Sequence, residues 1–231
     1  MKPDDSVSLA SELRLLLTES WPVIVSNSIN MFYYLTALVA VGRVGAHELA
    51  ATGFALMFCN MTGHSVLIGL SSGLDTVASQ LFGAGRHHAV GVSLQRAVLV
   101  TAVAAVPVSI LWLTSRLFMA EFVEQDVALR AGEFTAVMTA GLWPYALNEC
   151  LKRYLNAQGV FLPTMYAAGL ALAFHVPVCF LLVGSLGSTG VAAALVITNI
   201  LGTAEDVLLL IWLRGLHRKT WAGWTRESLT G

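Results

Sequence analysis

Six stretches of about twenty mostly apolar residues dominate this sequence. A hydrocarbon core about 30 Å thick is spanned by roughly 20 residues of α-helix. The stretches that meet this length are residues 21–41, 49–70, 93–114, 134–151, 164–184 and 191–213. The chain is 56% hydrophobic and only 12% charged, against roughly 45–50% and 25% in soluble domains. The sequence therefore predicts an all-α, multi-pass integral membrane protein that folds as a bundle of six transmembrane helices in the lipid bilayer.

The distribution of lysine and arginine predicts how this bundle sits in the membrane. With the N-terminus in the cytoplasm, only three basic residues lie outside: Arg43, Arg116 and Arg130. The other ten lie inside, namely Lys2, Arg14, Arg86, Arg96, Lys152, Arg153, Arg214, Arg218, Lys219 and Arg226. Cytoplasmic loops of membrane proteins carry such an excess. We therefore expect a cytoplasmic segment over residues 1–20, a membrane lobe over 21–213 and a cytoplasmic tail over 214–231.

Several polar side chains interrupt the apolar stretches at helical spacing. Asn27 and Asn30 are three residues apart, and Asn60 and His64 are four apart, so each pair shares one helix face. Polar groups at this depth normally face a cavity or a polar partner. We take these four residues as candidates for lining a substrate path. The alternative is that they form hydrogen bonds between helices.

Three further ionisable residues lie inside the predicted spans: His175, Glu205 and Asp206. A hydrogen-bonded packing role is the favoured interpretation for His175. Glu205 and Asp206 are adjacent, about 100° apart around a helix. At most one of them is therefore expected to face the interior, and neither is a favoured site residue.

Enzyme chemistry finds no support in the sequence. We find no nucleophile elbow, no His-Glu-x-x-His metal motif and no Walker A loop. No metal or cofactor is expected, and the net charge of -1 gives no reason to expect a nucleic acid partner. Polar residues on interior faces without a catalytic constellation favour a transporter or a channel.

Several separated motifs resemble the MATE (multidrug and toxic compound extrusion) family, and more narrowly its eukaryotic branch. Residues 60–76, 79–83 and 90–96 resemble the second and third helices of that family. Residues 42–49 resemble the end of its first helix, and Pro22 matches the start of that helix. Residues 152–163 resemble its loop between helices four and five, and residues 220–224 resemble its segment after helix six. Within these motifs Asp75, Gln80 and Arg96 fit structural roles, with Asp75 paired to Arg86 or Arg96.

The resemblance implies a secondary antiporter that exports small organic cations by alternating access, driven by protons rather than Na⁺, in the plasma membrane. Such transporters carry two six-helix lobes related as parallel repeats, and this sequence resembles the N-terminal half only. In that family Asn27 and Asn60 match polar lining of the first lobe. The acidic residue that many prokaryotic members carry in their first helix is absent from residues 35–38. Three interpretations stay open: part of a full antiporter that pairs with a second lobe, a half-size transporter active as a homodimer, and a membrane protein that does not transport.

Overall fold

The computed structural model describes residues 9–209, 220, 221 and 223, and its regular elements in that part are all helical. The elements are α1 (Leu9–Gly42), α2 (Ala46–Cys59), the π-helical turn η1 (Asn60–His64), α3 (Ser65–Gly83), α4 (His87–Leu113), α5 (Ser115–Met119), α6 (Gln125–Ala157) and α7 (Phe161–Leu208). The fold class is thus the predicted one, an all-α membrane bundle.

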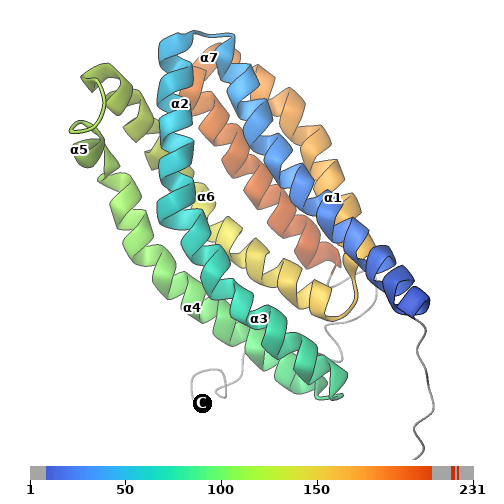
Figure 1. Cartoon of the computed structure of the whole chain (residues 1–231). Helices are drawn as coiled ribbons and strands as arrows, with labels where there is room; N and C mark the ends of the chain where they lie inside the picture. The colour runs from blue at the N-terminus through green and yellow to red at the C-terminus, as the bar shows by residue number, and fades with distance from the viewer. Residues whose placement is uncertain (1–8, 210–219, 222, 224–231) are drawn as a thin grey trace, which may run out of the picture.

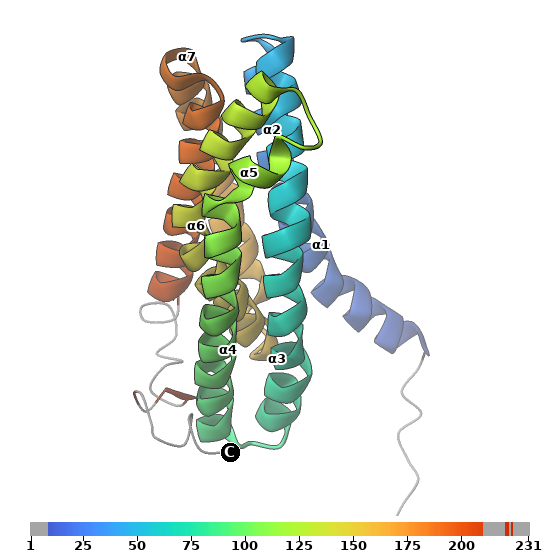
Figure 2. The ribbon, with the colours of Figure 1, turned by 90° about the vertical axis from the view of Figure 1, so that its left-hand side faces the viewer.

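Long antiparallel helices lie side by side around α6. Helices α2, η1 and α3 follow one another without a loop, and α7 turns back on itself at Gly187. Helix α6 contacts α2, α3, α4, α5 and α7, whereas α1 packs on α7 and α2. Figure 1 shows the α1–α2 connection and the turn of α7 at one end of the bundle and the α3–α4 connection at the other. In the view turned by 90°, the first part of α1 points away from the other helices (Figure 2).

The helices run beyond the apolar stretches that predicted them. Helix α1 begins at Leu9, so Pro22 lies inside it and does not open it, and α6 extends over Gln125–Ala157. An apolar stretch marks only the part of a helix that meets hydrocarbon, and the helix continues into the interfacial region. Within the described residues, four helical stretches are long and apolar enough to cross a membrane: Glu12–Gly42, Ala46–Gly83, His87–Leu113 and Phe161–Leu208. The count of six spans stays a prediction, as do the helix bounds and the cytoplasmic placement of both termini; most of the tail lies outside the described residues.

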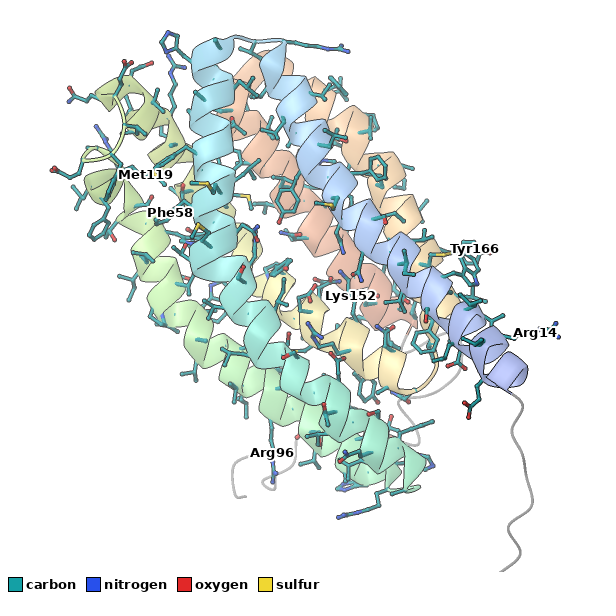
Figure 3. The ribbon with its side chains drawn as sticks, viewed as in Figure 1. Arg14, Phe58, Arg96, Met119, Lys152 and Tyr166 are labelled. Atoms are coloured by element: carbon teal, nitrogen blue, oxygen red, sulfur yellow. The ribbon has the colours of Figure 1, made fainter. Side chains whose placement is uncertain are left out.

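Large apolar side chains cover the outside of the bundle. Met31, Val103, Leu117 and Leu181 each expose more than 70% of their surface. A soluble monomer rarely exposes contiguous apolar surface on this scale, whereas lipid tails solvate it. Arg14 and Arg96 are labelled towards the end where α1 begins (Figure 3). Arg43 lies in the connection between α1 and α2, Arg116 in α5 and Arg130 near the start of α6, at the opposite end (Figure 1). Which end faces the cytoplasm stays a prediction.

Glu48 joins three elements at the end where α1 passes into α2. It lies in the first turn of α2, forms an ion pair with Arg130 of α6 and accepts a hydrogen bond from the Ser188 backbone N–H at 3.2 Å. Ser188 follows Gly187, whose φ of 58° and ψ of -135° allow α7 to reverse direction. Few residues other than glycine adopt this conformation, so Gly187 and Glu48 together place the second arm of α7 against the first.

We expect Gly187→Ala to destabilise the bundle, because alanine is strained at this φ/ψ by about 1–3 kcal/mol. Its Cβ would lie at an ordinary van der Waals distance, 3.6 Å, from the Glu48 carboxyl group, so the expected loss comes from the backbone conformation. The measurement is the midpoint of thermal unfolding in detergent micelles, which should fall by several degrees. Gly184→Ala is the matched control, since a Cβ there meets nothing within 4 Å. Equal midpoints for the two variants would contradict this account of the turn.

Candidate functional site: a charged cavity inside the bundle

A cavity of about 710 Å³ lies between α1, η1, α3, α6 and both arms of α7. Its wall combines asparagine, tyrosine and charged side chains, although the surrounding bundle is apolar. A second hollow of about 570 Å³, between α4, α6 and α7, is lined almost wholly by apolar groups and has no charged residue in its wall. The polar cavity is therefore the candidate site for a polar or charged ligand.

The four residues proposed from the sequence as substrate-lining all lie in the wall of this cavity. Asn27 and Asn30 come from α1, and Asn60 and His64 come from the two ends of η1. Asn27 and Asn60 are exposed, Asn30 is half-buried, and His64 is buried with 3% of its surface exposed. The structure thus brings residues that are more than thirty positions apart in the sequence to one surface.

Aromatic side chains surround His64 within the cavity. The hydroxyl of Tyr34 lies 3.2 Å from His64 Nδ1, and the rings of His64 and Tyr145 are 4.4 Å apart between centroids. Tyr33 donates a hydrogen bond to the Ala168 carbonyl at 3.1 Å, which ties α1 to α7. His64 Nε2 is enclosed and has no hydrogen-bond partner among the described residues.

Both Glu205 and Asp206 lie in the cavity wall, so the expectation that at most one would face the interior is wrong. The error lay in assuming one narrow interior direction. The cavity extends from α1 to α6, and two side chains 100° apart on α7 both reach it. Asp206 is 3% exposed and accepts a hydrogen bond from Asn148 Nδ2 of α6 at 2.9 Å.

His175 lies behind this wall. Its Nδ1 is 2.8 Å from the Thr198 hydroxyl, so it joins the two arms of α7. Its ring also meets that of Tyr33 edge to face, with 5.1 Å between the centroids. His175 therefore contacts two residues that line the cavity, Tyr33 and Thr198, and is not itself part of the cavity wall.

Asp75 pairs with Arg153 and not with Arg86 or Arg96, which corrects the pairing expected from the sequence. Arg153 of α6 also donates to Ser71 Oγ at 2.9 Å and lies 3.7 Å from Glu149. Arg86 and Arg96 are near Asp75 along the chain, but Arg153 reaches it because α6 packs against α3. Gln80 and Arg96 are exposed residues of α3 and α4 and are not part of the cavity wall.

One stripe of α6 supplies the charged part of the wall that the sequence analysis missed. Its members recur every three or four residues and are Tyr145, Asn148, Glu149, Lys152, Arg153 and Asn156. This is the spacing of one helix face, so a search for polar periodicity could have found it. Within the stripe, Lys152 Nζ lies 3.6 Å from Glu149. Such a stripe inside an otherwise apolar bundle is typical of a membrane transporter.

The chain belongs to the MATE family, whose members are transporters. The family model MatE matches residues 22–181. Protein DETOXIFICATION 51 of Arabidopsis thaliana is 34% identical over 96% of this chain and 42% of its own length, and Protein DETOXIFICATION 16 is 30% identical over 96% and 46%. The crystal structure of the eukaryotic MATE transporter AtDTX14 superposes with a TM-score of 0.86 at 27% identity, over 94% of this chain and 50% of that one. This chain thus spans about half the length of the relatives it matches.

Removing the Arg153 side chain should destabilise the bundle more than removing the Asp75 charge. Arg153→Met removes the donor to Ser71 and Asp75 and one of the two cationic partners of Glu149, and a lost buried partner costs about 1–3 kcal/mol. Asp75→Asn acts on a half-exposed carboxylate, for which about 1 kcal/mol or less is expected. Thermal unfolding in detergent measures both.

A double-mutant cycle tests the pairing itself. Asp75→Asn and Arg153→Met should be non-additive, because they remove the same contact. Asp75→Asn and Arg86→Met should be additive. The reverse pattern would restore the pairing of Asp75 with Arg86.

Proposed function

We propose that this chain is the first lobe of an antiporter that exports small organic cations in exchange for protons, and that its charged cavity is part of the substrate path. The observation that carries the proposal is the environment of Asp206. This carboxyl group lies in the cavity wall, is almost wholly buried and is bonded to the neutral amide of Asn148. No cationic side chain of the described residues forms an ion pair with it.

An ionised carboxylate in such a place needs a compensating positive charge. Removing a carboxylate from water without a partner costs several kcal/mol. Lys152 belongs to the same wall, but its ammonium group lies against Glu149 at 3.6 Å. A bound proton or a bound organic cation would each neutralise Asp206. Competition between the two for one carboxyl group is the elementary requirement of proton–cation exchange.

The rest of the wall suits an organic cation. Four carboxylates, those of Asp75, Glu149, Glu205 and Asp206, outnumber the two cationic side chains of Lys152 and Arg153. An excess of negative charge in a cleft with low-dielectric walls concentrates cations. Tyrosine faces attract organic cations, and the amide oxygens of Asn27, Asn30 and Asn60 can accept hydrogen bonds from them. These asparagines and His64 are the proposed substrate-lining residues.

Alternating access requires a partner for this lobe. In transporters built from parallel repeats, two six-helix units rock against each other around a site near the membrane midplane. The partner would be a second lobe or, for a half-size transporter, a second copy of this chain. The plasma membrane is the proposed location. A membrane protein that binds cations without transporting them is the alternative function.

Cation binding to the purified chain in lipid nanodiscs should release protons. We expect tetraphenylphosphonium, titrated in weakly buffered solution with a pH dye, to release about one proton per bound cation at the pH where Asp206 is protonated in the free chain. Because the proton competes with the cation, affinity should rise as pH rises, up to about tenfold per pH unit for one proton. Asp206→Asn should bind without proton release and without this pH dependence. Glu133→Gln, at an exposed position of α6 outside the cavity wall, should behave like the unsubstituted chain.

Unchanged proton release in Asp206→Asn would overturn the assignment of Asp206, and absence of cation binding would overturn the proposed function. Uptake of a fluorescent organic cation into proteoliposomes under an imposed proton gradient then separates the remaining possibilities. Uptake by the chain alone would establish the half-size transporter. Binding without uptake would favour a lobe that needs a partner or a protein that does not transport.

A further inference from the structure

The cavity residues Asn60 and His64 are presented by a π-helical turn. In η1 the Ser65 N–H donates to the Asn60 carbonyl, five residues back, where an α-helix would pair residues four apart. One turn therefore contains an extra residue, and the helix that follows is rotated relative to the helix before it by about 100°. Single π turns are rare and recur at functional sites. Outside the cavity wall, this turn packs against α4.

Trp112 of α4 is joined to this turn by two consecutive hydrogen bonds that pass through Thr62. Its indole N–H donates to Thr62 Oγ1 at 2.9 Å, and the Thr62 hydroxyl donates to the Phe58 carbonyl at 2.7 Å. Thr62 thus uses both its donor and an acceptor site between α4 and the backbone just before η1. Trp112 is fully buried, with 0% of its surface exposed, and it is not part of the cavity wall.

The indole ring also lies directly against the backbone of the turn. A Cβ on Gly63 would lie 2.2 Å from Trp112 Cζ2 and 2.9 Å from Cε2. No side chain fits there unless the ring moves, so Gly63 and Trp112 form one closely packed contact. The ring therefore fixes the distance between α4 and η1 as well as the hydrogen bond to Thr62.

Beyond the turn, the same indole contacts His64. The two rings meet edge to face with 5.6 Å between centroids and an angle of 87° between planes. On its other sides His64 meets the Tyr34 hydroxyl and the Tyr145 ring in the cavity. A continuous set of contacts thus runs from buried Trp112, through η1, to the cavity wall.

We propose that Trp112, acting through Thr62 and Gly63, is a positioning residue that holds η1 in its π form and so aims Asn60 and His64 into the cavity. The role assigned to Asn60 and His64 in cation binding rests on the proposed function. The stabilisation of the π turn by Trp112 is independent of the proposed function. If the turn relaxed to α-helical pairing, Asn60 and His64 could no longer both keep their present directions, because the helix on one side of them would rotate.

Hydrogen–deuterium exchange of the chain in nanodiscs tests the hold without any ligand. Trp112→Phe keeps an aromatic ring but removes the N–H, and Thr62→Val removes the hydroxyl at nearly constant shape. Loss of one net hydrogen bond of about 1 kcal/mol corresponds to roughly fivefold faster opening. We expect this increase in a peptide covering residues 58–66 for both variants. Thr62→Ser should restore slow exchange. Trp143→Phe, at a half-exposed tryptophan in the wall of the apolar hollow, is the matched control and should change nothing in this peptide.

Tetraphenylphosphonium affinity tests the positioning. Trp112→Phe and Thr62→Val should each raise the Kd severalfold, and the double variant should raise it no further. Thr62→Ser and Trp143→Phe should have a Kd close to that of the unsubstituted chain. Unchanged exchange over residues 58–66 in both variants would overturn the hold on the turn. Faster exchange with unchanged Kd would overturn the positioning role. If the unsubstituted chain binds no cation, the proposed function fails, and the exchange data still decide whether Trp112 holds the π turn. If Trp112→Phe does not fold, the comparison of Thr62→Val with Thr62→Ser decides by the same readouts.

Discussion

The high cost of an unpaired charge or polar group in hydrocarbon governs this structure. Lipid offers no hydrogen bonds, so every backbone group must be paired internally and every charged side chain needs a partner or a cavity. The bundle meets the first condition because every regular element in its described part is a helix and the connections between them are short. It meets the second by gathering charges on the inner stripe of α6 and pairing most of them, Arg153 with Asp75 and Lys152 with Glu149. The two acidic residues of α7 are exceptions among the described residues: Asp206 is bonded to a neutral amide, and Glu205 Oε2 is enclosed without a hydrogen-bond partner.

The same constraint explains why the membrane class and part of the site could be predicted from the sequence. Long apolar stretches and the asymmetry of basic residues can be recognised in the sequence without knowing which helices pack against one another. Asn27 and Asn30, and likewise Asn60 and His64, are spaced so that each pair shares a helix face, and the structure places all four at one cavity. The stripe on α6 carries an equally legible period, but the predicted span ends at residue 151 and Lys152 and Arg153 were assigned to the cytoplasm, whereas α6 continues to Ala157 and both residues line the cavity.

What could not be predicted depends on contacts between distant segments. Asp75 was expected to pair with an arginine close in sequence, but the packing of α6 against α3 brings Arg153 to it. Glu205 and Asp206 were judged by their angle on one helix, whereas the width of the cavity decides that both reach it. The π turn at Asn60–His64 has no signature in local propensity. It depends on Trp112, which lies about fifty residues further along the chain. In each case a partner on another helix determines which way a side chain points.

A path for organic cations requires that the polar cavity be open to water although the bundle is embedded in the membrane. The most direct test is thiol labelling with a charged, membrane-impermeant reagent on the chain in proteoliposomes, since thiols in hydrocarbon do not ionise and do not react. The three native cysteines are buried, so the unsubstituted chain provides the baseline. Asn27→Cys, near the middle of α1 in the cavity wall, should react and be protected by an organic cation. Val103→Cys, near the middle of α4 on the exposed apolar surface, should not react. Equal labelling of the two positions, or none at position 27, would contradict the account.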